Sequence, residues 1–532
     1  MLQIPSHSRK MELSTLTPPV MLLLLLYHQV DGTHVSEEVP CVPRDFGHSS
    51  FVCVCNSSYC DTLPTPEVPP EGQYLLYTSD LAGNRFHKTR HFFDGFKNNV
   101  SSTEAVVEFQ LDWTTTFQTV MGWGGAFTDA ATANILSLPG PAQDLLLSSY
   151  FSSYGLEYNI GRVNMGGCDF SWRTYTYVDE EGDVDLNTFA LQPEDTEYKI
   201  PVIKRAEAMA TRPLRLFASP WTAPPWMKTN NDFIGYGQLL PEMYQPWANY
   251  FVKFLEAYAA EDIVFWGITA QNEPIDGYVP GFFFNCMGWT AEEQRLFVAE
   301  NLGPTLQAHG YAQVKLMILD DQRYELPKWA KEVLNDTSAA QYVDGIAIHW
   351  YGDSYTSPSR LDETHDLFPD YFILGTEACK GAGPLDAAVV LGSWERCESY
   401  AHDIIIDMNH WVTGWVDWNL ALDMEGGPNW AKNFVDSPII VNKEKEEFYK
   451  NPMFYAMGHF SKFVKEGALR VSLTSPDSKG LDAVAFKNRD DTTAIILLNR
   501  SKKEMQVGVR IHQRGTIFLT VGPRSLHTAF YV

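Results

Sequence analysis

The chain has 532 residues, 45% hydrophobic and 13% aromatic, a composition typical of a globular protein of two or three domains. Its 66 acidic residues outnumber its 40 Lys and Arg residues, and the resulting formal charge of −26 argues against nucleic acid as a partner. Protonation of its 14 histidines would offset part of this negative charge, so an acidic compartment would reduce the self-repulsion of the chain.

The N-terminal segment predicts a secretory leader. Arg9-Lys10 precedes an apolar run over residues 20–27, and Gly32 begins a polar segment. This run of about eight residues is far shorter than the roughly 20 needed to cross a bilayer. We therefore expect a signal peptide over residues 1–39, cleaved between about Gly32 and Pro40. An uncleaved anchor is the alternative.

Four cysteines cluster just after this leader, at Cys41, Cys53, Cys55 and Cys60. In a secreted chain such a cluster indicates disulfides, and four cysteines permit three pairings. Cys53 and Cys55 are too close to bridge comfortably, so we expect two small loops. Zinc binding is the alternative, although no histidine pattern accompanies the cysteines. Asn-x-Ser/Thr sequons, which need exposure in a secretory lumen, occur at Asn56, Asn99, Asn335 and Asn499.

From about residue 117 onward, short apolar runs alternate with helical patterns. The runs predict strands over residues 120–125, 159–165, 214–219, 263–269, 314–319, 345–349, 372–375 and 412–418. The clearest helix covers residues 246–259, where apolar residues recur at helical spacing: Trp247, Phe251, Phe254, Leu255 and Tyr258. Eight strand–helix alternations over about 300 residues predict an α/β fold, the (β/α)8 TIM barrel. A doubly wound open sheet is the alternative.

The C-terminal region has a different pattern, of short runs separated by turns at residues 469–473, 483–487, 494–499, 506–511, 516–521 and 528–532. It predicts an antiparallel β-sandwich, to which residues 73–78 and 105–111 could add strands from before the barrel. We expect three domains. They are a small three-stranded β domain with two disulfides (40–66 plus 420–451), the β-sandwich (67–116 plus 467–532) and a catalytic barrel (117–419 plus 452–466).

Two glutamates follow predicted barrel strands. Glu273 lies in Asn272-Glu273-Pro274 after the fourth strand, and Glu377 ends the seventh. TIM barrels hold their catalytic groups at this end of the strands. Retaining glycoside hydrolysis needs an acid that protonates the leaving oxygen and a carboxylate nucleophile about 5–5.5 Å away. We interpret Glu273 as the acid/base, protonated in the free enzyme, and Glu377 as the ionised nucleophile. Exposed loop carboxylates are the alternative interpretation.

Other residues near the predicted strand ends suit support or sugar binding. Arg162, in the second strand, could hold Glu377 ionised by charge pairing, or form only a structural salt bridge. Asp169 could accept hydrogen bonds from sugar hydroxyls or cap a loop, and Asn272 is placed to bind the sugar 2-hydroxyl. Aromatic rings at strand ends are either sugar platforms or barrel-top packing: Trp221, Trp350, Tyr351 and Trp418.

Motifs for other chemistries are missing from the sequence. Gly122-Trp123-Gly124-Gly125 lacks the third glycine of a dinucleotide fingerprint, and there is no P-loop, His-Glu-x-x-His or Gly-x-Ser-x-Gly.

Seven motifs form a specific set: Cys53-Val54-Cys55-Asn56, Arg173-Thr174-Tyr175-Thr176-Tyr177, Ser219-Pro220-Trp221-Thr222, Asn272-Glu273-Pro274, His349-Trp350-Tyr351, Trp418-Asn419-Leu420-Ala421-Leu422 and Glu425-Gly426-Gly427-Pro428-Asn429-Trp430. Together they resemble the lysosomal acid β-glucosidases of glycoside hydrolase family thirty. The resemblance extends from about Cys41 to the C-terminus.

This resemblance implies a retaining β-glucosidase that hydrolyses glucosylceramide and related β-glucosyl lipids through a covalent glucosyl-enzyme, with Glu273 as acid/base and Glu377 as nucleophile. It implies a glucose subsite formed by Asp169, Trp221, Asn272, Trp418 and Asn433, with Phe284 and Tyr351 nearby. It also implies the pairs Cys41–Cys53 and Cys55–Cys60, and no metal or organic cofactor.

The resemblance implies partners and a location as well. The expected partners are saposin C, an anionic phospholipid surface contacted peripherally, and a lysosomal integral membrane protein that acts as the trafficking receptor. The expected location is the lysosome lumen.

The sequence departs from the family's pattern at Gln271, Ile275-Asp276-Gly277 and Lys380-Gly381-Ala382-Gly383. These positions rim the expected pocket, so they bear on aglycone preference and activator dependence. Two other functions stay open: a secreted glycanase acting on polymeric xylan or glucan, and a non-catalytic binding or trafficking protein. An apolar rim, which suits a lipid better than a polysaccharide, is favoured by Phe282, Phe283, Phe284 and Trp289.

Overall fold

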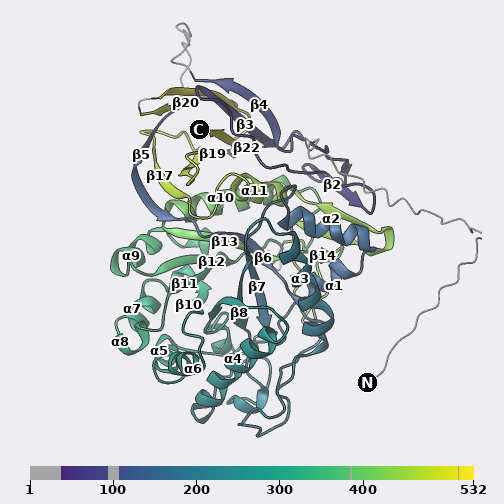
Figure 1. The fold of residues 1–532 in the computed structure, drawn as a ribbon, viewed down its shortest axis with the longest axis vertical. Coiled ribbons are helices and arrows are strands. Elements are labelled where there is room, and N and C mark those ends of the chain that lie inside the picture. Colours follow the sequence, from purple (N-terminus) through teal and green to yellow (C-terminus); the bar gives the residue numbers. More distant parts are fainter. Residues whose placement is uncertain (1–37, 94–106, 384–385, 513) are drawn as a thin grey trace, which may run out of the picture. The chain divides into compact units, whose positions relative to one another are not determined.

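The computed structural model describes residues 38–93, 107–383, 386–512 and 514–532, and their strands form three sheets (Figure 1). All but the last two residues of the predicted signal peptide lie outside the described part of the chain, as does Asn99. Among the described residues, no helix combines the length and the apolar character that crossing a membrane requires.

The eight predicted barrel strands are all present and parallel. They are β6 (Gly122–Ala126), β7 (Ile160–Met165), β8 (Arg215–Pro220), β9 (Phe265–Thr269), β10 (Lys315–Gln322), β11 (Gly345–His349), β12 (Phe372–Glu377) and β13 (Val412–Asn419). Strand β13 pairs with β6, which closes the barrel, so the open-sheet alternative is wrong. The barrel interior is packed with apolar side chains: Ile160, Phe217, Met317, Ala347, Leu374 and Val416. Burial on both faces explains why these strands are continuous apolar runs in the sequence.

Helices connect the strands, as the crossovers of a (β/α)8 barrel require. They are α1 (Asp129–Leu136), α2 (Gly140–Phe151), α3 (Ile200–Met209), α4 (Tyr244–Ala259), α5 (Ala291–Phe297), α6 (Gly303–Ala308), α7 (Lys328–Leu334), α8 (Thr337–Ala340), α9 (Ser359–Leu367), α10 (Trp394–Asn409) and α11 (Pro452–Ser461) (Figure 1). Helix α4 buries all five residues that predicted it. It begins two residues before the predicted start, directly after the 3-10 turn Pro241–Met243.

The β-sandwich is a nine-stranded sheet folded over one apolar core, which contains Tyr74, Phe109, Ile495 and Ile517. Its strands are β3 (Gln73–Asp80), β4 (His87–Phe92), β5 (Val107–Thr119), β17 (Leu469–Thr474), β18 (Asp482–Lys487), β19 (Thr493–Asn499), β20 (Met505–Ile511), β21 (Gly515–Val521) and β22 (Ser525–Tyr531). Strand β3 pairs with β22, and β5 pairs with β17 and β20. The barrel is therefore inserted in the sequence of the sandwich.

The small sheet contains β1 (Pro43–Asp45), β2 (Phe51–Asn56), β16 (Glu447–Lys450), β15 (Ile439–Asn442) and β14 (Leu422–Asp423), in that order. It has five strands where three were predicted, because the short strands β1 and β14 pair along its two edges. Disulfides join Cys41 to Cys53 and Cys55 to Cys60. The residue limits of the three domains stay a prediction.

The sequons differ in exposure. Asn335 is exposed and Asn56 is half-buried. Asn499 is only 1% exposed, and its Nδ2 donates hydrogen bonds to the carbonyls of Lys503 (2.8 Å) and Gly522 (2.7 Å). A glycan on Asn499 would have to break these bonds, so the structure disfavours this sequon, whereas glycosylation of Asn56 and Asn335 stays a prediction.

Candidate active site

A cavity of about 270 Å³ lies where the C-terminal ends of the barrel strands meet. Glu273 and Glu377 both line it. So do six of the seven residues predicted to bind substrate: Asp169, Trp221, Phe284, Tyr351, Trp418 and Asn433. Asn272, the seventh, is not among the lining residues, and its side chain is hydrogen-bonded to Arg162.

The barrel strands position the two glutamates. Glu377 is the last residue of β12, whereas Glu273 follows β9 in a turn and has a φ of 39°. This left-handed conformation is unfavourable for a residue other than glycine, and such strain is typical of functional sites. The turn is fixed by backbone hydrogen bonds from the Glu273 amide to the Asp320 carbonyl (2.9 Å) and from the Asp276 amide to the Glu273 carbonyl (3.0 Å).

Arg162 and Asp320 form a buried ion pair beneath the glutamates. Arg162 Nη2 lies 2.9 Å from Asp320 Oδ2, while Nη1 contacts Glu377. Asp320 accepts further hydrogen bonds from Ser219, Thr269, Thr376 and His349. Burial alone would raise the pKa of Asp320, but the charges of Arg162 and His349 hold it well below its usual range. Arg162 therefore contacts Glu377 as predicted, and it is itself held by a second carboxylate.

His349 connects this ion pair to Glu273. Its Nδ1 lies 3.0 Å from Glu273 Oε1, and its Nε2 lies 3.1 Å from Asp320 Oδ1. Burial opposes the charge on the imidazole, yet Glu377 and these two carboxylates raise the pKa of His349 to about 10. The ring is then an imidazolium that donates from both nitrogens. Gln322 Nε2 also donates to Glu273 Oε1, at 3.0 Å.

The pKa values of the two glutamates shift in opposite directions. Burial raises the pKa of Glu377, although His349 and Arg162 oppose this. Burial also acts to raise the pKa of Glu273, but the hydrogen bond and charge of His349 outweigh it and lower that pKa. The Asp276 carboxyl, hydrogen-bonded to Glu273, has a pKa well above its usual value because of burial and the charge of Glu273. The pKa of Glu273 thus shifts in the direction opposite to the one that a protonated acid/base requires.

Two stacked tryptophans form one wall of the cavity. The rings of Trp221 and Trp418 lie 5.3 Å apart, and the Arg162 guanidinium carbon lies 4.9 Å and 5.2 Å from their centroids. Cation–π attraction to Arg162 therefore helps to hold the two rings beside the ion pair. Tyr351 OH donates to Glu377 Oε1 at 2.8 Å, so it contacts the same glutamate from another side.

Asp169 is held by two asparagine side chains. Its Oδ2 accepts from Asn433 Nδ2 (3.0 Å) and from Asn429 Nδ2 (3.1 Å). Burial raises the pKa of Asp169 to about 7, although these two bonds oppose the shift. At acid pH this carboxyl can therefore donate as well as accept a hydrogen bond.

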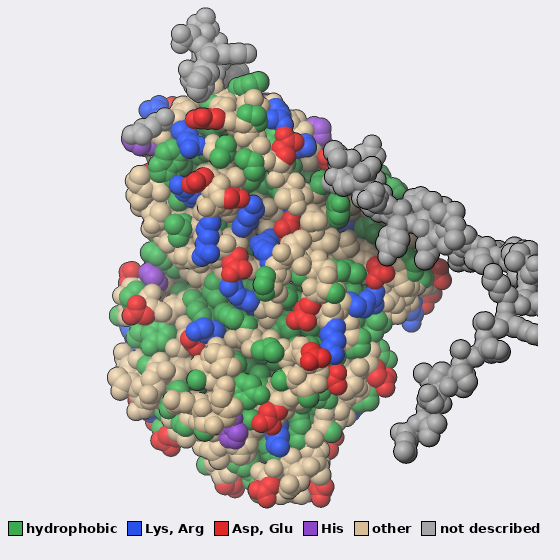
Figure 2. Space-filling view, viewed as in Figure 1, with side chains coloured by type: hydrophobic (Ala, Val, Ile, Leu, Met, Phe, Trp, Pro, Cys, Tyr) green, Lys and Arg blue, Asp and Glu red, His purple; other side chains and the backbone are tan. Residues whose placement is uncertain are grey.

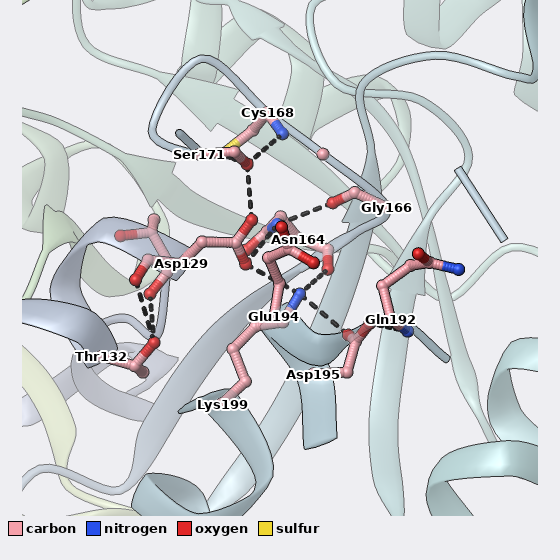
Figure 3. A network of polar contacts seen from close by, with 12 residues as sticks. Asp129, Thr132, Asn164, Gly166, Cys168, Ser171, Gln192, Glu194, Asp195 and Lys199 are labelled. Atoms are coloured by element: carbon pink, nitrogen blue, oxygen red, sulfur yellow. Dashed lines mark hydrogen bonds and ion pairs between the residues drawn. The ribbon is translucent and has the colours of Figure 1, made fainter. Parts of the chain in front are cut away.

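A separate buried network holds the loop that carries Asp169 (Figure 3). Lys199 Nζ lies 3.0 Å from Asp129 and 2.9 Å from Asp195. Asp129 also accepts a hydrogen bond from Ser171, two residues beyond Asp169. Because one lysine is placed between two carboxylates with no solvent contact, this network anchors the loop to helix α1 and to the π-helical turn Glu194–Lys199.

The sequence analysis gave no role in the site to His349, Asp320, Gln322 or Asn429, and it placed Asp276 only at the rim of the expected pocket. Gln322 and His349 are the last residues of β10 and β11, so their position was a usable signal. The ligand atoms of Glu273, His349 and Glu377 lie within 4.8 Å, close enough for a metal ion, but both His349 nitrogens already bond to carboxylates. Gln271 Nε2 donates to the carbonyls of Trp221 and Asn272, not to Glu273.

The family models agree with this geometry. Residues 120–464 match the glycosyl hydrolase family 30 TIM-barrel domain, and residues 467–529 match the family 30 β-sandwich domain. The chain is 48% identical to the lysosomal acid glucosylceramidase of Mus musculus over 92% of this chain and 95% of that protein.

Two solved structures are similar across most of the chain. SrfJ from Salmonella typhimurium matches with a TM-score of 0.79 and 28% identity, covering 86% of this chain and 99% of that one. The endo-β1,6-glucanase BT3312 matches with a TM-score of 0.74 and 26% identity, covering 87% of this chain and all of the other. From the two family models, and from an active-site cavity lined by two glutamates at the barrel end, it follows that the chain is a glycoside hydrolase and belongs to family 30.

Proposed function

We propose that this protein is a retaining β-glucosidase that hydrolyses glucosylceramide to glucose and ceramide. The observation that carries the proposal is the different support of two glutamates on one cavity. Glu377 contacts Arg162 and Tyr351, whereas Glu273 contacts His349 and Asp276. The identity to the mouse lysosomal acid glucosylceramidase supports the same substrate.

In the proposed mechanism Glu377 attacks the anomeric carbon while Glu273 protonates the leaving oxygen, and a covalent glucosyl-enzyme forms. Glu273 then removes a proton from water, which displaces Glu377 and releases glucose. Arg162 stabilises the Glu377 carboxylate before attack and after release. Trp221 and Trp418 supply an apolar face for the sugar ring. No step needs a metal or an organic cofactor.

A lipid aglycone fits the apolar rim of the cavity. Phe282, Phe283 and Phe284 contact one another there, and Phe283 is 51% exposed. On the face seen in Figure 2, acidic and basic side chains are interspersed and no large basic patch is visible. Contact with an anionic phospholipid surface would therefore depend on apolar side chains and on an acid pH.

The proposed location rests on the relative named above, and the proposed partners rest only on the resemblance of the sequence motifs. The protein acts in the lysosome lumen and contacts the membrane peripherally. Saposin C activates it, and a lysosomal integral membrane protein carries it there. A glycanase is the second candidate, because BT3312 is an endo-β1,6-glucanase. Turnover of glucosylceramide in detergent, with no release of sugar from soluble β-1,6-glucan, would separate the two.

The nucleophile is tested by trapping. A 2-deoxy-2-fluoro-β-glucosyl fluoride should label Glu377 in the intact protein, and peptide mass spectrometry would locate the adduct. Glu377→Gln should lose turnover and labelling while it keeps its thermal unfolding transition. Labelling of another residue, or normal turnover by this variant, would overturn the assignment.

A further inference from the structure

Asp276 places a third carboxyl group beside the two glutamates of the cavity. It begins the 3-10 turn Asp276–Tyr278, and its backbone amide donates to the Glu273 carbonyl at 3.0 Å. Its side chain lines the cavity and is hydrogen-bonded to the Glu273 carboxyl. Two carboxyl groups can form a hydrogen bond only when one of them carries a proton.

The other contacts of Glu273 act against its role as an acid. Its Oε1 accepts from His349 and from Gln322, and both donors favour the ionised carboxylate. A glutamate held by these donors alone would lose its proton to solvent before the substrate arrives.

The surrounding charges are mostly negative. Several ionisable groups interact with Glu273: Arg162 on β7, Asp321 on β10, His349 on β11, Glu377 on β12, Asp169 and Tyr351 in the loops after β7 and β11, Tyr324 on the turn after β10, and Asp276. Asp320 on β10 bonds to His349 on the side away from Glu273. Two cations thus face a larger set of carboxyl groups. Keeping one proton between Glu273 and Asp276 reduces this repulsion.

We propose that Asp276 is a positioning residue that keeps the catalytic proton at Glu273: the two carboxyls share one proton across their hydrogen bond. This inference rests on the proposed function, in which Glu273 is the acid/base. Asp276 does not act on the substrate and works only through Glu273.

The proton balance follows the two steps of the reaction. In the first step the pair gives its single proton to the glycosidic oxygen as the C1–O bond breaks, the aglycone leaves as an alcohol, and Glu377 becomes the glucosyl ester. In the second step Glu273 takes a proton from the attacking water, glucose leaves, and the pair again holds one proton. No oxidant, metal or co-reactant is required.

The test is the pH dependence of kcat/KM for Asp276→Asn. The Asn amide donates to Glu273 and so favours the ionised glutamate. We expect the basic limb, where Glu273 loses its proton, to move to lower pH by at least one unit. At a pH above the new limb, kcat/KM for an alkyl β-glucoside should fall at least tenfold. The loss on 2,4-dinitrophenyl β-glucoside should be smaller, because that leaving group needs little protonation.

Two variants separate this role from a structural one. Asp276→Glu restores the carboxyl and should return the basic limb toward its original pH. Asp232→Asn removes an exposed negative charge from the loop whose Gly235 amide bonds to the Phe282 carbonyl, and it should leave the limb in place. An unchanged limb in Asp276→Asn, or equal losses on the two substrates, would overturn the proposal. Glu273→Gln tests the proposed function separately, since it should lose alkyl-glucoside turnover whether or not Asp276 matters.

Discussion

Asp320 holds the charged residues of the site in place, because it has no solvent contact and balances the charge of Arg162. Arg162, Glu273 and Glu377 were predictable, because charged residues within or after apolar strands are unusual and barrel strands end at the site. Asp320 was not. Leu319 and Asp320 have φ values of 70° and 58°, and the pairing of β10 shifts register here. A bulge breaks the two-residue period of a strand, so the sequence could not show that Asp320 faces the site.

Replacing Asp320 should therefore damage more than one contact. In Asp320→Asn the buried Arg162 and the imidazolium of His349 lose their shared counter-charge. We expect the free energy of unfolding to fall by about 3–5 kcal/mol, the usual cost of breaking a buried pair. Urea unfolding at pH 5.5 measures this. Thr376→Val removes one hydrogen bond to the same carboxylate and should cost only about 1 kcal/mol. Equal losses in the two variants would contradict the assigned role of the charge.

Helix α10 contributes two aspartates to a buried cluster of three carboxyl groups. Asp403 and Asp407 lie one turn apart on it and face Asp353, with carboxylate oxygens within 4.8 Å of one another. In the described part of the chain, Arg323 is the only basic residue ion-paired with this cluster. No local sequence pattern could reveal the neighbours of α10, because Arg323 and Asp353 come from the loops after β10 and β11.

This cluster should make stability depend on pH. Burial raises the pKa values of Asp353, Asp403 and Asp407, and neighbouring carboxylates add to the rise at Asp353 and Asp407. A carboxyl with a raised pKa in the folded state stabilises fully below its unfolded pKa, near 3.9, and that stability is lost as pH rises toward the folded pKa. The loss is about 1.4 kcal/mol per pH unit for each proton that only the folded state retains.

The double variant Asp403→Asn/Asp407→Asn replaces two of the carboxyl groups that bind a proton more tightly in the folded than in the unfolded protein. As the pH rises from 5 to 7, the free energy of unfolding should fall less in the double variant than in the original protein. Near pH 4 the free energies of unfolding of the two proteins should be similar. Thermal melts at these pH values measure the difference. The exposed pair Asp477→Asn and Asp491→Asn is the control and should follow the original protein. A parallel pH dependence in all three proteins would refute the role of the cluster.

For the whole molecule, the sequence predicted the barrel and the sandwich because each has its own pattern. Buried parallel strands are continuous apolar runs, and sandwich strands are short runs between turns. The extra edge strands β1 and β14 have three and two residues, too few to show a period. The small sheet joins β2 to β16, almost 400 residues later, so no local pattern could fix this pairing.

The disulfide Cys41–Cys53 should stabilise this long-range sheet. It closes a loop of 12 residues at its N-terminal edge, for which chain entropy predicts about 3 kcal/mol. Cys41→Ser with Cys53→Ser should lower the unfolding free energy by about that amount, as urea titration would show. The original protein in reductant, with both disulfides open, should lose at least as much. A variant as stable as the original would show that pairing to β16 alone holds β2.

The insertion of the barrel in the sandwich also has a consequence during synthesis on the ribosome. Strands β3 and β5 leave the ribosome before the barrel, but their partners β22, β17 and β20 are made last. At 5–20 residues per second, the roughly 400 residues between β5 and β22 take about 20–80 s to add. For that time two apolar strands wait with open edges, the condition under which nascent chains aggregate or bind chaperones. The last strands to be translated thus complete the whole fold, although they lie outside the catalytic barrel.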